Sequence, residues 1–356
     1  MQSFAIVMPS LKINGGNRVL LQLADELSAK DKRCTIYYID RPGETFKKKH
    51  RDYNITSIFG DSVASMILST ISMSIKLRFA KEFEYIVVSD PILGIFSFIY
   101  SNKKRVRYVQ SNDFELFSQN DKSNFFFDLL YKKLFKVSQK YAYLHVIFNS
   151  LYSINSYNKT ANEKLSTDLI INPPVFNLNS KFARIRDITP DNPIRVCIIS
   201  NNHSRKGLKE FIKIAKNTKL KKVNFILITQ DFLNINQSNI IIAKPKNDEE
   251  YLRILDTGHF ILSTSTFEGF GLPLLEGMAC GLVPIAIPNL GLVEYNQNNE
   301  VSLFNNHQEF DKVITNLMMH PDIYRYKSEQ AIKKASFFSI DNFYTKFFSE
   351  LISQKK

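Results

Sequence analysis

The stretch STSTFEGFGLPLLEGMACGLVPIAI occupies residues 263–287 and combines two glutamates with a high density of glycine. Seven residues separate Glu268 from Glu276, and four of the 12 glycines of the chain lie in this stretch. The segment His259–Thr264 has the apolar character of a buried strand that ends in hydroxyl side chains. The sequence therefore predicts a strand, a glycine-rich loop and a helix that begins near Leu274.

The predicted loop has the features of an anion site beside a hydroxyl-binding site. Gly269 and Gly271 allow a ligand to approach backbone N–H groups closely, and N–H groups at a helix N-terminus attract phosphate. Pro273 suits the first helical turn, where its missing N–H costs nothing. Carboxylates bind phosphates poorly but accept hydrogen bonds from sugar hydroxyls, so a nucleotide sugar explains both glutamates. The alternative is a capped helix whose glutamates are merely solvated.

The pattern E-G-F-G-L-P-L-L-E, followed by G-x-x-C-G-x-x-P-I-A, resembles the signature of retaining glycosyltransferases of family 4. The resemblance implies an α/β protein with the GT-B fold, in which two Rossmann-like domains face each other across a cleft. It also implies that Glu276 binds the donor ribose and that Glu268 contacts the transferred sugar. The backbone of Phe270, Gly271 and Leu272 would contact the sugar and the diphosphate.

The same family carries a basic motif after the first strand of its second domain, usually an Arg and then a Lys before a Gly. Here the stretch is ISNNHSRKGL, in which Lys206 precedes Gly207 and Asn201 stands near the expected Arg. We expect Lys206 to bind the diphosphate and Arg205 to replace the missing Arg, without a metal ion. Glu268, Lys206 and Arg205 form the predicted catalytic set. A solvated basic loop is the alternative.

Apolar strand-like runs alternate with amphipathic helical runs over most of the chain, which favours parallel α/β sheets. The stretch NPPV, residues 172–175, interrupts this alternation, because two prolines stop regular structure. We therefore expect an acceptor-binding domain over residues 1–174 and a donor-binding domain over residues 175–339. The C-terminal helix, about residues 340–356, is expected to pack back on the first domain. The predicted strands are Ser3–Leu11, Cys34–Ile39, Tyr85–Asp90, Val106–Ser111, Leu144–Ser150, Arg195–Ser200, Asn224–Thr229, Asn239–Lys244, His259–Thr264 and Val283–Ile287. The predicted helices are one with Val19, Leu20, Leu23, Ala24 and Leu27 on one face, Phe125–Lys140, Leu151–Tyr157, Leu208–Asn217, Asp248–Asp256, Glu309–Leu317 and Asp341–Ile352.

One feature of the first domain matches the family, and another departs from its usual pattern. Gly15 and Gly16 follow the first strand, where backbone can approach a sugar phosphate, although a plain tight turn would also explain them. The family often has a His at the end of a later strand, whereas RYVQSNDFELF has none and resembles rhamnosyltransferases of bacterial surface polysaccharides. Gln110 would then take the sugar-facing place, with Asn112 and Asp113 nearby. Ordinary polar capping of a strand end is the alternative.

The formal net charge is +13, which has two interpretations. It favours phosphates, nucleic acid or an anionic membrane face, but a Lys-rich and Asn-rich composition also explains it. The helix over Phe125–Lys140 and the four basic residues of Ser101–Arg107 suggest docking on an anionic membrane. A core-packing helix with a solvated lysine face is an equal alternative. No signal peptide or membrane span is expected, so the prediction is a cytoplasmic protein, at the inner face of the cytoplasmic membrane.

The chemistry expected from these residues needs no cofactor and no metal. Cys34, Cys197 and Cys280 are odd in number and lie in apolar runs, which predicts buried free thiols. No histidine or cysteine cluster has metal-ligand spacing. Since no carboxylate is placed as a nucleophile, we expect the leaving phosphate oxygen to take the acceptor proton on the same face of the sugar.

The function predicted is retaining transfer of a hexose or deoxyhexose from a nucleotide-diphosphate sugar to a glycan, in lipopolysaccharide or capsule synthesis. The acceptor would be lipid-linked. Three alternatives remain: a nucleotide-sugar epimerase, a non-catalytic glycan-binding relative and a nucleic-acid-binding protein. The epimerase would need further acid and base groups in the cleft, and the nucleic-acid reading lacks a recognition motif.

Overall fold

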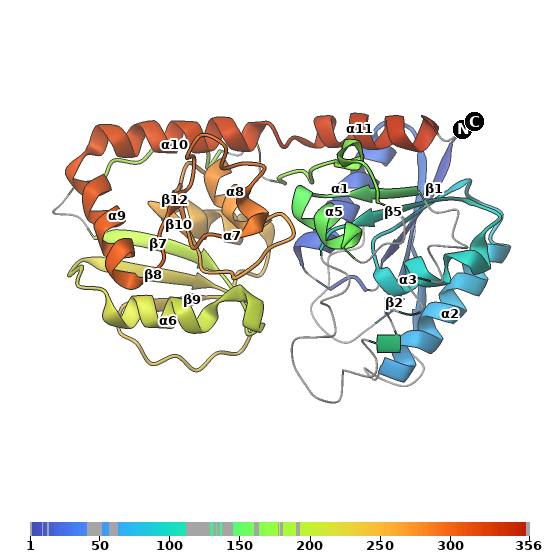
Figure 1. The fold of residues 1–356 in the computed structure, drawn as a ribbon, viewed down its shortest axis with the longest axis horizontal. Helices are drawn as coiled ribbons and strands as arrows, with labels where there is room; N and C mark the ends of the chain where they lie inside the picture. The colour runs from blue at the N-terminus through green and yellow to red at the C-terminus, as the bar shows by residue number, and fades with distance from the viewer. Residues whose placement is uncertain are drawn as a thin grey trace. The chain divides into compact units, whose positions relative to one another are not determined.

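The computed structural model describes residues 2–8, 10–12, 14–40, 52–56, 63–111, 129–130, 133, 136, 145–159, 164–176, 178, 181–189 and 193–353. The chain forms two compact units (Figure 1). Unit 1 comprises Met1–Pro174 together with Ile340–Lys356, and unit 2 comprises Val175–Ser339. No helix in the described part of the chain combines the length and the apolar character needed to cross a membrane.

Unit 1 is built around a parallel sheet whose described strands have the order β3-β2-β1-β4-β5-β6. The order reverses between β1 and β4, which makes the carboxyl ends of these two strands a topological switch point. The elements of unit 1 are β1 (Ser3–Met8), α1 (Gly15–Ala29), β2 (Arg33–Asp40), β3 (Asp52–Thr56), α2 (Val63–Phe79), β4 (Tyr85–Val88), α3 (Pro91–Ile95), the 3₁₀ helix η1 (Phe96–Tyr100), β5 (Lys104–Val109), β6 (His145–Phe148), α5 (Leu151–Asn158), η4 (Thr167–Leu169) and α11 (Ile340–Ser353).

Alternating strand residues give the sheet of unit 1 two different apolar faces. On one face, Phe4 stacks on Tyr85 with ring centroids 5.1 Å apart, and Phe4 also contacts Phe348 of α11. On the other face, Ala5 and Val7 belong to a core cluster that includes residues of α2, α3 and η1. Because successive side chains of a strand point to opposite faces, a continuous apolar run such as β1 is buried on both.

Unit 2 repeats this topology, with a parallel sheet of order β12-β11-β10-β7-β8-β9. Its switch point lies between β7 and β10. The elements of unit 2 are β7 (Ile194–Ile199), η5 (Ser204–Lys206), α6 (Leu208–Asn217), β8 (Val223–Ile228), β9 (Ile240–Ala243), α7 (Asp248–Asp256), β10 (Phe260–Ser263), α8 (Leu272–Ala279), β11 (Val283–Ala286), η6 (Leu290–Leu292), β12 (Ser302–Leu303), α9 (His307–Met319) and α10 (Pro321–Ser336).

The helices of unit 2 pack on both faces of its sheet. Residues of α7, α8 and α10 share one core cluster with the strand side chains Cys197, Ile226 and Ile261. Residues of α6 and α9 share the other cluster with neighbouring strand positions such as Val196 and Phe260. All three cysteines are buried free thiols, as the apolar runs around them predict.

The observed elements match most of the predicted ones, and α6 and α7 have the predicted bounds. The sequence reading missed β3, α2, α3, β12 and α10, and the helix predicted over Phe125–Lys140 lies mostly outside the described residues. One expectation was wrong: only part of the basic stretch Ser101–Arg107 is available at the surface. Arg105 and Arg107 are 3% and 2% exposed, because both point from the central strand β5 toward α3 and η1.

Candidate active site

The loops that follow β7 and β10 meet at the switch point of unit 2. The backbone N–H of Thr266 donates to the carbonyl of Arg205 at 2.9 Å, and the Thr264 hydroxyl donates to the carbonyl of Gly207 at 3.0 Å. The Ser200 hydroxyl donates to the carbonyl of Lys206 at 3.1 Å. These bonds hold the predicted basic motif and the predicted glutamate-rich loop side by side, although about 60 residues separate them in sequence.

Gly207 is required by this arrangement. Its φ is +64°, a conformation that costs a side-chain-bearing residue energy. A Cβ at this position would lie 1.8 Å from the carbonyl oxygen of Thr264. The glycine therefore allows the β7 loop to contact the β10 loop directly before the chain enters α6.

Lys206 and Glu268 form an ion pair with 2.7 Å between Nζ and Oε1, and their side chains are only 15% and 13% exposed. The Ser265 hydroxyl donates to the same carboxylate oxygen at 2.8 Å. A pair this shielded from water is held more firmly than a surface salt bridge. It presents an ammonium group and a carboxylate next to each other, which suits a phosphate oxygen beside a sugar hydroxyl.

Arg205 lies beside this pair on the same loop. The centre of its guanidinium is 5.5 Å from the centroid of the Phe267 ring, a cation–π arrangement. Its Nε is buried and has no hydrogen-bond partner among the residues that the structure describes. A buried charged donor without an acceptor is costly, so this guanidinium is suited to accept an anionic ligand.

The glutamate-rich loop ends at the N-terminus of α8, which begins at Leu272, two residues before the predicted start near Leu274. Gly271 precedes the helix with φ +83°, and a Cβ there would lie 2.3 Å from the Tyr295 hydroxyl. That hydroxyl donates to the carbonyl of Gly271 at 3.3 Å. Burial raises the pKa of Tyr295 well above its ordinary value, and the nearby carboxylates of Glu268 and Glu294 act in the same direction. Tyr295 therefore stays protonated and fixes the loop as a donor.

Glu276 and Phe270 have different roles in this loop and helix. Glu276 lies about one turn into α8, is 7% exposed and accepts a short hydrogen bond from the Tyr251 hydroxyl of α7. Phe270 is 2% exposed, and its ring packs on Tyr295 and Phe338. The side chain of Phe270 thus belongs to the core. At Phe270, as at Gly271, only the backbone can contact a ligand.

Asn201 begins a short turn that carries the basic residues. Its side-chain oxygen accepts from the backbone N–H of His203 at 3.1 Å, and the Asn202 N–H donates to Asp231 at 2.6 Å. Burial lowers the pKa of His203, and the charges of Arg205 and Lys206 lower it further. Sequence reasoning missed Asp231 and Tyr295, although both follow strands at the carboxyl edge where ligands bind in such sheets.

The carboxyl edge of unit 1 brings together a second set of predicted residues. Gln110 follows β5, and its side-chain amide donates to the Gly16 carbonyl at 3.1 Å and to the Ser89 hydroxyl at 2.8 Å. A Cβ on Gly16 would lie 3.3 Å from the Gln110 side-chain oxygen, so the glycine permits this approach. Gly15 is the first residue of α1. Asn112 and Asp113 lie outside the described residues.

Asparagine side chains support this edge of unit 1, and sequence reasoning missed them. Asn14 caps α1 by accepting from the Asn17 N–H at 2.8 Å. The Asn17 side chain donates to the carbonyls of Ser10 and Lys12. The Asn149 side chain donates to the Gln110 carbonyl at 2.9 Å. Polar residues directly after β1 and β6 were the available signal.

Comparison with known proteins identifies related sequences and folds. Residues 181–335, which are most of unit 2, match the family model described as "Glycosyl transferases group 1". A tRNA-queuosine alpha-mannosyltransferase of Drosophila melanogaster is 34% identical over 90 residues, which are 25% of this chain and 23% of the fly protein. The match thus spans about a quarter of each protein.

Several solved structures have the same fold. A sucrose-phosphate synthase from Thermosynechococcus elongatus aligns with a TM-score of 0.77 and 15% identity over 99% of both chains. HepE of Anabaena, solved with UDP and glucose, aligns with a TM-score of 0.72 and 16% identity over 99% of this chain and 100% of that one. WaaG, a glycosyltransferase involved in lipopolysaccharide biosynthesis, aligns at 0.69 and 13% over 94% and 95%. These structures confirm the predicted GT-B fold, and the family match over residues 181–335 shows that this part of the chain resembles glycosyltransferases of group 1.

Proposed function

We propose that this protein transfers a hexose or deoxyhexose, with retention of configuration, from a nucleotide-diphosphate sugar to a glycan acceptor. The observation that carries the proposal is the shielded Lys206–Glu268 pair at the switch point of unit 2. It lies in the segment that matches the glycosyltransferase model, next to the loop that leads into α8. The UDP bound by HepE of Anabaena supports a nucleoside diphosphate as the ligand.

Each predicted donor residue has a role in this proposal. Lys206 and Arg205 bind the diphosphate, and Glu276 accepts hydrogen bonds from the ribose hydroxyls. Glu268 accepts from a hydroxyl of the transferred sugar, while the backbone at Phe270, Gly271 and Leu272 lines the sugar and the diphosphate. Asn201 contributes to the same loop. Gly15, Gly16 and Gln110 of unit 1 bind the donor, on the side of the transferred sugar.

The reaction that these groups support is a same-face displacement. The bond between the anomeric carbon and the diphosphate oxygen breaks, and a bond from the acceptor oxygen to that carbon forms on the same face. The acceptor proton moves to the leaving phosphate oxygen. Lys206, Arg205 and the N-terminus of α8 stabilise the negative charge that develops there, so no metal ion is needed for this purpose. Activity should therefore persist in excess chelator.

We place the reaction in bacterial surface polysaccharide synthesis, at the inner face of the cytoplasmic membrane, with a lipid-linked acceptor. The likeness of RYVQSNDFELF to rhamnosyltransferases and the fold shared with WaaG support this placement. An epimerase, a non-catalytic relative and a nucleic-acid-binding protein are disfavoured by the family match over residues 181–335.

Thermal unfolding with UDP, dTDP, GDP and ADP tests the donor site. A nucleotide present at 100 times its Kd stabilises the folded state by about 2.7 kcal/mol, which raises the melting temperature by several degrees. We expect one nucleotide to give this shift, Glu276→Ala to abolish it and Glu249→Ala, on the exposed face of α7, to retain it. The absence of a shift with all four nucleotides would contradict the proposal. NMR of the anomeric proton in the first product then tests retention.

A further inference from the structure

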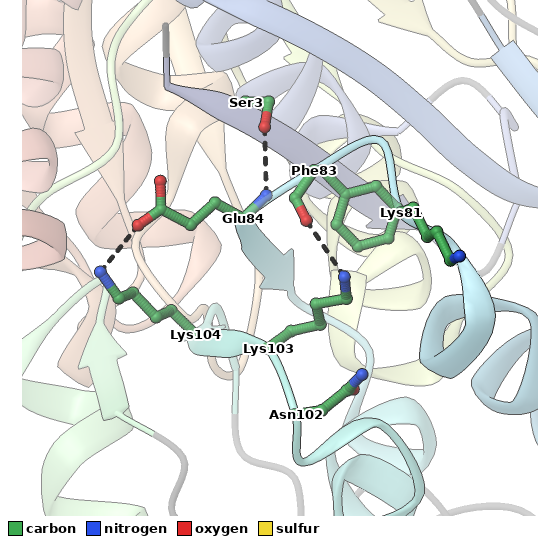
Figure 2. Close-up of a pocket in the computed structure, with 7 residues that line it drawn as sticks. All are labelled: Ser3, Lys81, Phe83, Glu84, Asn102, Lys103 and Lys104. Carbon is green, nitrogen blue, oxygen red and sulfur yellow. Dashed lines mark hydrogen bonds and ion pairs between the residues drawn. The ribbon is translucent and has the colours of Figure 1, made fainter.

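A basic pocket lies at the amino edge of the sheet of unit 1, at the opposite end of the strands from Gly16 and Gln110 (Figure 2). It is a shallow depression, open to solvent, at the point where β1, β4 and β5 begin. Lys81, Asn102, Lys103 and Lys104 line it, and Figure 2 shows the three ammonium groups pointing in different directions, that of Lys104 toward Glu84 and that of Lys103 toward the Phe83 carbonyl. None of these residues has a role in the proposed transfer reaction.

Most of the positive charge of this pocket is not neutralised by neighbouring carboxylates. Glu84 pairs with Lys104 at 2.8 Å. The Lys103 ammonium donates to the Phe83 carbonyl at 3.3 Å and lies 5.2 Å from the centroid of the Phe83 ring. Within the described ranges, neither Lys81 nor Lys103 forms an ion pair with a carboxylate. The pocket therefore keeps two cations that can bind an anion.

The helix that leads to this pocket, α2, has an exposed apolar stripe. Leu68, Ile75 and Phe79 are 46%, 45% and 71% exposed. At about 100° per residue, these three side chains fall within about 40° of one another around the helix axis. Lys76 and Arg78 lie about 80° to either side of the centre of the stripe, and α2 contains no acidic residue.

The stripe and the pocket form one continuous surface. The Arg78 guanidinium donates to the Ile99 carbonyl at 2.9 Å, and the Asn102 side chain donates to the Arg78 carbonyl at 3.1 Å. These bonds fasten the end of α2 to η1, where Phe98 is 51% exposed. We call this the α2 surface. It consists of the apolar residues Leu68, Ile75, Phe79 and Phe98 and the basic residues Lys76, Arg78, Lys81 and Lys103.

We propose that the α2 surface docks unit 1 onto an anionic lipid bilayer. The apolar stripe would enter the boundary between headgroups and acyl chains, as in helices that lie in a membrane interface. The flanking cations would contact lipid phosphates, and Lys81 and Lys103 would hold a headgroup in the basic pocket. A nucleic acid would use the charge but leave four large apolar side chains in water, so a bilayer accounts for the surface more completely.

This inference rests on the membrane contact proposed above and deepens it, because it adds the exposed face of α2 to Lys103 of the basic stretch from which the sequence suggested that contact. Since α2 connects the parallel strands β3 and β4, it runs back along the sheet, and a bilayer against it would lie alongside the strands. The carboxyl edge that holds Gly16 and Gln110 would then stay open to an acceptor. The docking itself needs neither donor nor acceptor.

Cosedimentation of the full chain with lipid vesicles tests the proposal. Vesicles of phosphatidylcholine alone are compared with vesicles that contain phosphatidylglycerol, at low and at high salt. We expect binding to the anionic vesicles at low salt and a large loss at high salt. Ile75→Ser with Phe79→Ser, and separately Lys81→Glu with Lys103→Glu, should each reduce the partition coefficient at least about tenfold.

Matched double variants in unit 2 control for general changes in apolarity and charge. Met319→Ser with Tyr326→Ser removes two side chains that are 64% and 61% exposed, and Lys209→Glu with Lys221→Glu makes the same charge change as the pocket variant. Both should bind vesicles as the wild type does. Equal losses in these controls, or no wild-type binding at low salt, would overturn the proposal.

Two further measurements separate the remaining outcomes. If sedimentation in solution shows a dimer that Ile75→Ser with Phe79→Ser converts to a monomer, a second copy covers the surface and the bilayer proposal is wrong. The nucleotide-induced rise in melting temperature is measured for every variant. Because the α2 surface is remote from Lys206 and Glu276 in sequence and lies in the other unit, this rise should be unchanged, so failure of docking and failure of donor binding are distinguishable.

Discussion

The carboxyl edges of the two sheets have the same strand order but different chemistry. In unit 2 the edge carries Lys206, Arg205 and Glu268, with Glu276 one turn into α8. Around Gln110, the described residues at the corresponding edge of unit 1 include amides and hydroxyls, and the Asp90 carboxylate caps α3. The same topology thus supports an ion-paired site at Lys206 and Glu268 and an amide-rich site at Gln110, because the loops and not the strands supply the functional groups.

The difference suggests a division of labour between the two edges. A diphosphate carries negative charge and needs the cations of unit 2, whereas a sugar or glycan offers neutral hydroxyls that amides recognise well. Variants at matched positions of the two edges therefore test whether the edges differ in function.

The largest effect is expected for Lys206→Ala. Removal of one preorganised donor to a developing oxyanion lowers kcat by about 100–1,000-fold, and here the partner carboxylate of Glu268 is also left without its cation. Initial-rate measurements with sugar donors that carry the nucleotide identified by thermal shift would check this. Lys209→Ala, on the exposed face of α6, is the matched control. A loss of less than tenfold in Lys206→Ala would remove Lys206 from the catalytic set.

A large effect on stability is expected for Gly207→Ala. The φ of +64° and the Thr264 carbonyl, 1.8 Å from the new Cβ, both oppose the alanine, so the free energy of unfolding should fall by about 3 kcal/mol or more. Gly16→Ala in unit 1 meets the Gln110 side chain at 3.3 Å and the Asn14 side-chain oxygen at 3.5 Å, and it should cost less than about 1 kcal/mol. Urea unfolding of both variants gives the comparison. Equal losses would show that the two glycines are held in equivalent ways.

A smaller and selective effect is expected for Gln110→Ala. The change removes hydrogen bonds to Gly16 and Ser89 that together contribute about 1–2 kcal/mol, so kcat/KM should fall by about tenfold. Because Gln110 belongs to unit 1, the nucleotide-induced rise in melting temperature should remain. Ser89→Ala, which removes only one of these bonds, should lose less activity. A loss of nucleotide binding in Gln110→Ala would contradict the proposed division between the two edges.

The smallest effect concerns the pH dependence of unit 2. Burial, together with the charges of Arg195 and Arg186, lowers the pKa of His259 to about 4. The unfolded chain, with a pKa near 6.5, then binds the proton more readily, so this contribution to stability is complete above about pH 6.5 and is lost toward pH 4. Urea unfolding at pH 7 and pH 4.5 measures how much stability is lost on acidification. The free energy of unfolding of His259→Asn should fall by about 1–2 kcal/mol less than that of the wild type, after allowance for solvent screening. An equal fall in the free energy of unfolding between pH 7 and pH 4.5 in the wild type and in His259→Asn would show that His259 does not cause it.

The sequence predicted most of the fold, because the strands of both sheets are apolar runs of distinctive length. It also predicted α6 and α7, whose apolar faces repeat with helical period and which end close to the expected residues. It missed α2, where serines interrupt the pattern and apolar residues lie on more than one face. Only the structure therefore shows which apolar residues of α2 are exposed and which are buried.

The sequence also identified the residue types of the candidate site, since glycines, glutamates and a Lys-Gly pair stand out in a glycine-poor chain. It could not predict that Lys206 pairs with Glu268, that Gln110 binds Gly16, or that Arg105 and Arg107 are buried. Each of these depends on which strands become neighbours. β7 lies next to β10, with β8 and β9 on its other side, and chain order alone does not fix that placement.

By itself, the sequence determined the local structure and the chemical inventory of this protein: buried strands, capped helices, and glycines where the backbone must turn or approach another chain segment. The tertiary structure decided which of those groups act together. The reason is physical: hydrogen bonds and ion pairs require separations of about 3 Å, and only the packed order of the strands brings residues as distant in sequence as Lys206 and Glu268 within that range.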